Sequence, residues 1–169
     1  DDESDNWYAE GGNSVLMEQF TATWCDVCAQ IDPWISNFAD ERGSRLVRIA
    51  LHDPVADPLG SSISSERLSI HSNSMDLAPS FWFDSNNEIK GTVDPVDLDR
   101  ALLNSEGVRE SDTIISISGA ENFDSNSMDL RVNLFNVDNS SNSQVSIFLL
   151  ADIIIDKSQA TNGLSLIHI

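Results

Sequence analysis

Both cysteines of the chain lie in one short stretch, at Cys25 and Cys28. Two thiols separated by two residues can close into a small disulfide ring and reopen by thiol–disulfide exchange. A strand-like run over 15–20 precedes the pair and helical spacing begins at Cys25, which predicts a strand-to-helix junction. The free N–H groups and partial positive charge of a helix N-terminus stabilise a thiolate on the first cysteine. The pattern therefore predicts Cys25 as the attacking sulfur and Cys28 as the resolving sulfur.

Two other interpretations of the pair are open from the residues alone. The cysteines could form a permanent structural disulfide or degenerate site, or they could bind a metal ion. Zinc takes about four protein ligands, and His52 and His71 would have to join the pair. Nothing in the spacing brings either histidine near the cysteines. We therefore expect no metal, and no cofactor other than the redox-active Cys25–Cys28 disulfide itself.

The composition is ordinary for a globular protein apart from its charge. The chain has 169 residues, with 28 Asp and Glu against 9 Lys and Arg, and a net charge of −19. A surface this acidic repels nucleic acids and anionic lipids, so neither is expected as a partner. It suits a secreted protein or one from a salty environment. No run of about 18 apolar residues occurs, which predicts that this stretch holds no transmembrane helix.

Hydrophobic spacing predicts alternating strands and helices up to residue 104. The expected strands are 15–20, 46–51, 81–83 and 89–93, and the expected helices are 25–42, 64–71 and 95–104. Pro33 lies inside the first helix, where it should produce a kink. Asp94 and Pro95 are typical of a helix N-cap and a first helical position, and Gly43 is typical of a residue just past a helix end.

The character of the chain changes after residue 106. Helical spacing disappears, and loops rich in Asn, Ser and Asp separate three strand-like runs, at 113–118, 130–137 and 145–155. This pattern predicts a truncated β-sandwich of the immunoglobulin-like type.

Four parts are therefore expected along the chain. They are a flexible acidic lead-in (1–13), an α/β domain (14–106), the partial β-sandwich (107–163) and a six-residue tail (164–169). The tail reads like the translation of a sequencing adapter. We therefore expect a metagenomic fragment that is cut short there.

The first domain resembles the thioredoxin superfamily over residues 15–104. Thr23-Trp24-Cys25-Asp26-Val27-Cys28 matches the active-site motif, and Pro33, five residues after Cys28, matches the helix-kinking proline. Ala78-Pro79-Ser80, before a hydrophobic strand, resembles the cis-proline loop. A CxxC pair alone is a weak signal, but this succession of motif, proline, strand, hairpin and helix is specific.

The resemblance implies a thioredoxin-like fold, with a central mixed β-sheet flanked by helices. It implies a protein-disulfide oxidoreductase that acts on protein disulfides or dithiols together with a redox partner. Pro79 would be cis and would face the disulfide, and Ala78 and Ser80 would hold the substrate backbone. Trp24, Asp26 and Val27 would line the substrate-binding surface.

Similarity to exported relatives suggests where the protein acts. The long segment 52–77 and the appended β region resemble those of exported thioredoxin-like proteins. We therefore expect an extracytoplasmic location, which means secreted, periplasmic or cell-surface.

Two departures from thioredoxin itself leave the direction of electron flow open. The spacer is Asp26-Val27 rather than Gly-Pro, and the Asp26 charge beside Cys25 opposes thiolate formation. Thioredoxin carries a buried acid six residues before the first cysteine, where this chain has Gln19. Glu18 is expected to point to the other strand face as a solvated residue.

Two other classes of function compete with the oxidoreductase. One is a non-catalytic cell-surface binding or adhesion module, in which the thioredoxin-like fold is a scaffold and the β-sandwich supplies contacts. The other is a copper- or zinc-handling protein that uses both cysteines and a histidine.

Overall fold

A computed structural model describes the chain at residues 6–8, 14–71, 78–108, 114–122, 127–135, 145–147, 154–156 and 165–167. The elements in chain order are β1 (Asn6–Tyr8), β2 (Val15–Thr21), α1 (Asp26–Arg42), a 3-10 turn (Gly43–Arg45), β3 (Leu46–His52), α2 (Ser62–His71), β4 (Ser80–Phe83), β5 (Asn87–Lys90), α3 (Pro95–Gly107), β6 (Ile114–Asn122), β7 (Ser127–Phe135), β8 (Ile154–Asp156) and β9 (Ser165–Ile167). The chain divides into two compact units, which are described separately.

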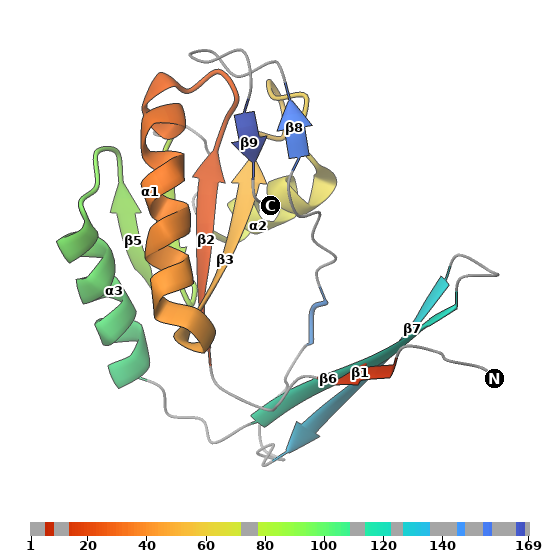
Figure 1. The fold of residues 1–169 in the computed structure, drawn as a ribbon. Coiled ribbons are helices and arrows are strands. Elements are labelled where there is room, and N and C mark those ends of the chain that lie inside the picture. The colour runs from red at the N-terminus through yellow and green to blue at the C-terminus, as the bar shows by residue number, and fades with distance from the viewer. Residues whose placement is uncertain are drawn as a thin grey trace. The chain divides into compact units, whose positions relative to one another are not determined.

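The larger unit is built on a four-stranded mixed sheet with the order β3-β2-β4-β5 (Figure 1). β2 and β3 are parallel, and their register runs from Val15 opposite Leu46 to Thr21 opposite His52. β4 is antiparallel to β2, and β5 is antiparallel to β4. Because β2 and β3 are parallel, they end at the same edge of the sheet, where the cysteine motif begins.

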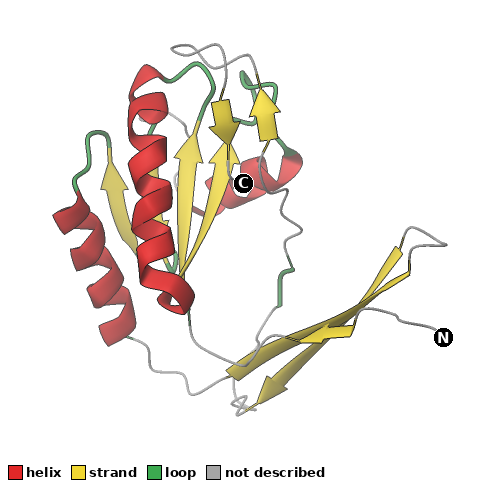
Figure 2. Cartoon of the chain, viewed as in Figure 1, coloured by secondary structure: helices red, strands yellow, loops and turns green. Residues whose placement is uncertain are grey.

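Helices cover both faces of this sheet (Figure 2). Side chains alternate across β2, so Val15 and Met17 enter the core beneath α1 and α3, while Phe20 packs on the opposite face with Leu68 of α2. The first core contains Val15, Met17, Ile31, Ile35, Phe38, Leu46, Phe81, Phe83, Val93, Leu98, Ala101 and Leu102. The architecture is therefore the α/β class expected from the sequence, with a mixed sheet between helices.

Local signals set both ends of α1. Cys25 is its N-cap, Asp26 lies in the first turn and Arg42 in the last, each with the charge that the helix dipole favours. The helix ends at Arg42, and Gly43 caps it with a φ of 51°, a conformation that glycine adopts readily. Pro33 lies inside α1, and the kink expected there stays a prediction.

The elements after α2 also follow their sequence signals. Asp94 caps α3 by accepting hydrogen bonds from the N–H groups of Val96 and Asp97, and Pro95 occupies the first turn. The helix continues to Gly107, past the expected end near residue 104. β5 covers 87–90 rather than 89–93, because the turn with positive φ at Asp84 and Ser85 is tighter than expected.

The smaller unit contains a three-stranded antiparallel sheet with the order β1-β6-β7. β1 lies within the segment expected as a flexible lead-in, and its residues 6–8 pair with β6. The strands described in this unit form this one sheet, so the immunoglobulin-like sandwich stays a prediction.

Two short pieces of strand follow in the last part of the chain. Of the strand expected over 145–155, residues 145–147 have no regular secondary structure, 148–153 lie outside the described residues, and the last two fall in β8. β8 and β9 pair antiparallel with each other, and β9 lies within the six-residue tail.

Candidate active site

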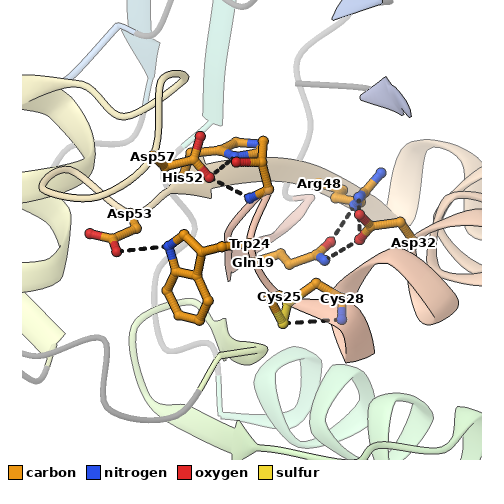
Figure 3. The surroundings of a disulfide bond; sticks show 10 residues. Gln19, Trp24, Cys25, Cys28, Asp32, Arg48, His52, Asp53 and Asp57 are labelled. Atoms are coloured by element: carbon orange, nitrogen blue, oxygen red, sulfur yellow. Dashed lines mark hydrogen bonds and ion pairs between the residues drawn. A yellow bond between two sulfur atoms is a disulfide. The ribbon is translucent and has the colours of Figure 1, made fainter. Parts of the chain in front are cut away.

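Cys25 and Cys28 form a disulfide at the N-terminus of α1, with their Cα atoms 5.2 Å apart (Figure 3). The two half-cystines differ in accessibility, since Cys25 is 6 % exposed and Cys28 is fully buried. The Cys25 sulfur also accepts a hydrogen bond from the Cys28 N–H, at 3.1 Å. Cys25 is therefore the more accessible half-cystine, and its sulfur is the one that accepts a backbone hydrogen bond.

The chain reaches this geometry through a tight turn at the end of β2. The Cys25 N–H donates to the Ala22 carbonyl at 3.1 Å, and the Ala29 N–H donates to the Cys25 carbonyl as the helix begins. The first N–H groups of a helix have no partner inside it, and one of them here meets the sulfur. The partial positive charge of the helix end favours negative charge at the same place.

The proline loop lies against the disulfide. Ala78 packs on the buried cluster of Ala22, Cys25 and Cys28, and the Ala78–Pro79 peptide is cis, as the resemblance implied. Pro79 is buried, and its carbonyl accepts a hydrogen bond from the Gly91 N–H at 2.8 Å. Ser80 is 8 % exposed and begins β4 opposite Phe20. The structure therefore brings Ala78 to the disulfide, whereas the Ser80 side chain is held inside the sheet.

The exposed rim of the site comes from the cysteine motif itself. Trp24 is 47 % exposed, Val27 is 42 % exposed, and Asp26 between the cysteines is also exposed. The Trp24 indole N–H donates to an Asp53 carboxylate oxygen at 3.2 Å. This hydrogen bond fixes the orientation of a large aromatic surface beside the sulfurs.

A buried aspartate joins the end of β3 to the turn before Cys25. The Asp57 carboxylate accepts hydrogen bonds from the Thr23 and Leu59 N–H groups and lies 3.0 Å from Nδ1 of His52. Burial alone would raise the pKa of Asp57, but these hydrogen bonds, with His52 foremost, lower it below its ordinary value of 3.8. Among the described residues, Nε2 of His52 is a buried atom with no hydrogen-bond partner.

The loop that carries Asp57 is also packed tightly on itself. A Cβ at Gly60 would overlap the carbonyl oxygen of Asp53. The Gly60 N–H donates to the Asp57 carbonyl at 2.9 Å. The loop thus presents Asp53 to Trp24 and Asp57 to Thr23 as one unit.

A second polar group, partly buried, lies between β2, β3 and α1, and consists of Gln19, Asp32 and Arg48 (Figure 3). The Gln19 amide donates to Oδ1 of Asp32 at 2.7 Å and accepts from Nε of Arg48 at 2.9 Å. Arg48 also donates to the Ser36 hydroxyl at 2.8 Å, and one of its nitrogens lies 3.8 Å from Oδ1 of Asp32. We call these three residues the Gln19–Asp32–Arg48 cluster.

Burial dominates the acid–base properties of this cluster. It raises the pKa of Asp32 above 3.8, against the opposing effects of the Gln19 hydrogen bond and the positive charges of Arg48 and His52. It also lowers the pKa of Arg48, although the nearby carboxylate of Asp32 opposes that change. The site therefore contains a carboxyl group that holds its proton more tightly than usual.

The expectation of a solvated Glu18 is wrong, because its side chain is fully buried. Arg67 binds both of its oxygens, at 2.6 and 2.8 Å, and Nε2 of His71 lies 2.9 Å away. The His71 ring stacks on Trp82 with centroids 4.5 Å apart. The sequence did contain a signal, since Glu18 alternates with Leu16 and Phe20 on one strand face and so shares their burial.

The sequence analysis also missed Asp32, Arg48 and Asp57. Asp32 had a signal, because it follows Cys28 by four residues and precedes Ile35 by three, which places it on the buried helix face. In the described part of the chain, no group of three or more His, Cys, Asp or Glu side chains could hold a metal ion. No helix among the described residues is long and apolar enough to cross a membrane.

Comparisons with known proteins give limited similarity. No family model matches the chain, and no curated protein matches it. Among solved structures, an exposed lipoprotein thioredoxin from Streptococcus pneumoniae is 16 % identical with a TM-score of 0.43, and the match covers 54 % of this chain and 84 % of that one. A malarial protein is 16 % identical with a TM-score of 0.42, over 55 % of this chain and 98 % of that one. A protein from Agrobacterium tumefaciens is 15 % identical with a TM-score of 0.43, over 68 % of this chain and 60 % of that one.

Similarity at this level establishes neither a family nor a function. What the chain itself shows is a mixed α/β unit with a CxxC disulfide where β2 meets α1, and a proline loop against that disulfide. This arrangement is consistent with a thioredoxin-like fold.

Proposed function

We propose that the protein is a thiol–disulfide oxidoreductase that acts on protein disulfides or dithiols through Cys25 and Cys28. One observation carries the proposal. Cys25, the more exposed of the two residues at 6 %, caps the N-terminus of α1 and accepts a backbone hydrogen bond there, while its partner Cys28 is fully buried. A permanent staple requires no such asymmetry, whereas exchange requires one attacking and one resolving sulfur.

The reaction takes place in two exchanges. The Cys25 thiolate attacks one sulfur of a substrate disulfide, and the other substrate sulfur leaves with the electron pair and takes a proton from solvent. Cys28, once it has lost its proton, attacks the Cys25 sulfur. The Cys25–Cys28 bond forms, and the second substrate sulfur leaves as a thiolate. Two electrons pass from the protein to the substrate, and the same steps in reverse oxidise a substrate dithiol.

The rim residues would receive the substrate. Trp24 and Val27 offer exposed apolar surface beside Cys25, Asp26 contributes a charge between the cysteines, and Ala78 before Pro79 faces the disulfide. Since the Ser80 side chain is buried, we assign Ser80 to fixing the proline loop through β4.

The domain division and the location remain part of this proposal. We propose that residues 14–106 form the catalytic domain, followed by a partial β-sandwich over 107–163. The net charge of −19 supports an extracytoplasmic site of action and protein substrates rather than nucleic acid.

The test compares two matched variants in an assay of protein disulfide reduction. Cys25→Ser is expected to abolish exchange, because the attacking sulfur is gone. Cys28→Ser is expected to attack the substrate but to accumulate as a mixed disulfide that mass spectrometry detects. Full activity in Cys25→Ser would rule out the proposed function.

A further inference from the structure

The resolving sulfur of the proposed reaction lies where water does not reach it. Cys28 is fully buried, and its neighbours in the site are Ala22, Cys25 and Ala78. A thiol attacks a disulfide only as the thiolate, so the Cys28 proton must first move to another group. A protein side chain close to Cys28 is therefore required as the acceptor.

Few groups on the surrounding elements can take that proton. Gln19 on β2 has an amide, which does not titrate, and Arg48 on β3 stays protonated. His52 on β3 is held by Asp57 through Nδ1, and its Nε2 is buried and has no hydrogen-bond partner among the described residues, so it has no route for a proton to solvent. On α1, Asp32 is the carboxyl that shares the buried helix face with Cys28.

The geometry of Asp32 suits this role in three respects. Residues four apart on a helix are neighbours, with Cβ atoms about 5–6 Å apart, so Asp32 lies one turn from Cys28. The hydrogen bond from Gln19 directs its carboxyl toward β2, the strand that leads into the motif. Within the described residues, both contacts of Asp32 end on Oδ1, which leaves Oδ2 open to a proton.

Asp32 also connects the buried thiol to solvent. Its side chain is 20 % exposed, whereas Cys28 is fully buried. A proton that reaches the carboxyl from Cys28 can therefore pass on to water without any movement of the disulfide.

We propose that Asp32 is the proton acceptor for Cys28 in the resolving step, an inference that rests on the proposed function. The Cys28 thiol transfers its proton to Oδ2 of Asp32, and the resulting thiolate attacks the Cys25 sulfur of the mixed disulfide. The Cys25–Cys28 bond forms and the bond to the substrate sulfur breaks. The substrate leaves as a thiolate, and Asp32 releases its proton to solvent.

The charges around Asp32 are compatible with this task. Burial raises its pKa and so brings its proton affinity closer to that of a thiol, which favours transfer. Arg48 and His52 from β3, the second paired with Asp57, oppose that rise and keep the carboxyl able to accept a proton. Gln19 keeps the carboxyl in place whichever form it takes.

The experiment separates the two exchanges by using a neutral aromatic disulfide, 2,2′-dipyridyl disulfide. Its neutrality avoids repulsion by a chain of charge −19. Attack by Cys25 on this reagent releases one pyridine-2-thione, and resolution by Cys28 releases a second. Stopped-flow absorbance of the fully reduced protein therefore reports both steps as separate phases across a range of pH.

Asp32→Asn keeps the shape and the Gln19 contact but cannot accept the proton. We expect it to slow the second phase about a hundredfold, the lower end of what a general base contributes (about 10²–10⁴), and to leave the first phase within about twofold. Glu41→Gln is the matched control, since Glu41 is an exposed acid on the same helix that contacts Arg42 rather than the cluster. It should leave both phases unchanged.

Two results would overturn the assignment of Asp32. One is a second phase in Asp32→Asn that matches the wild-type phase over the whole pH range. The other is a second phase that slows in His52→Gln but not in Asp32→Asn. If the reduced wild-type protein released pyridine-2-thione in neither phase, the proposed function itself would be contradicted. The two failures are therefore distinguishable.

A rescue variant excludes a merely structural effect. Gln19→Glu in the Asp32→Asn background places a carboxyl where the Gln19 amide lies, 2.7 Å from Oδ1 of residue 32. It should restore part of the second phase and its pH dependence. If the double variant folds, shows a normal first phase and resolves as slowly as Asp32→Asn, the carboxyl is not the acceptor.

Discussion

Glu18 and Gln19 are adjacent in β2, point to opposite faces of the sheet and have different hydrogen-bond partners there. Glu18 lies under α2, where Arg67 and His71 occupy both of its oxygens. Gln19 lies under α1, where its amide donates to Oδ1 of Asp32; among the described residues both contacts of this carboxyl end on Oδ1, and its side chain is 20 % exposed. The comparison indicates that the hydrogen-bond partners of a carboxyl group, more than its burial, decide its role. A carboxyl with both oxygens paired stabilises the fold, whereas one with an open oxygen can exchange a proton.

Glu18→Ala should have the largest effect on stability. Removing one partner of a buried ion pair costs about 3–5 kcal/mol, because the charge that is left loses its compensation. His71 is 1 % exposed and would lose its carboxylate partner. Urea unfolding should show this loss, while Glu66→Gln, at an exposed position one residue before Arg67, should change stability little. If Glu18→Ala unfolds at the same urea concentration as the wild type, the ion pairs of Glu18 do not stabilise the fold.

Asp57 extends the comparison to a carboxyl beside the cysteine motif. Both of its oxygens have hydrogen-bond partners, one of which is the Thr23 N–H. Its pKa is lowered in the folded protein, so its contribution to stability is present above the ordinary value of 3.8 and is lost as pH falls through the folded value. Asp57→Asn should cost about 2 kcal/mol at pH 7, as for hydrogen bonds to a charged group.

The measurement for Asp57 is the free energy of unfolding as a function of pH. The difference between wild type and Asp57→Asn should shrink as pH falls below about 4. A constant difference at all pH values would show that the charge of Asp57 has no part in it.

Arg48→Met tests how charge in the Gln19–Asp32–Arg48 cluster affects the pKa of Asp32. Arg48 opposes the rise in the pKa of Asp32, so its removal should raise that pKa further. Because Asp32 accepts a proton only when ionised, the pH profile of the second pyridine-2-thione phase should move to higher pH. The first phase reports only Cys25 and serves as the internal control. An unchanged pH profile of the second phase would show that Asp32 takes no part in the resolving step.

Asp32→Asn should have the smallest effect on stability, and of opposite sign. The pKa of Asp32 is raised in the folded state, so the folded protein binds this proton more tightly than the unfolded chain and becomes relatively more stable as pH falls through the raised value. Asparagine removes the buried charge, and the variant should be slightly more stable than wild type at pH 7. Thermal unfolding at pH 7 and at about pH 3, below the ordinary value of 3.8, measures the difference, which should become small at the lower pH; a less stable variant at pH 7 would contradict this account.

The sequence predicted the parts of the site that local spacing determines. The CxxC pair, Pro33 and the strand after Pro79 are short-range patterns, and the helix caps at Cys25 and Asp94 depend on neighbours within three residues. Alternation and helical period therefore sufficed to place the disulfide at the end of β2.

Partners distant in sequence could not be predicted in the same way. Glu18 meets Arg67 49 residues later, Gln19 meets Arg48 29 residues later, and Thr23 meets Asp57 34 residues later. A single charged residue in a strand has no periodicity of its own, and its burial becomes evident only when its neighbours on the same face are considered. The start of β5 at Asn87 depends on a tight turn in which Asp84 and Ser85 have positive φ. The identities of these two polar residues do not determine that turn type.

The most direct test of the central claim is the reduction potential of the Cys25–Cys28 couple in the folded protein. Equilibration against glutathione and dithiothreitol buffers, followed by thiol trapping and mass spectrometry, gives this value. The account predicts complete and reversible reduction under native conditions, with a potential between about −120 and about −270 mV, the range of thiol–disulfide exchange proteins. A disulfide that is reduced only when the protein unfolds would contradict it and would identify the pair as a structural staple.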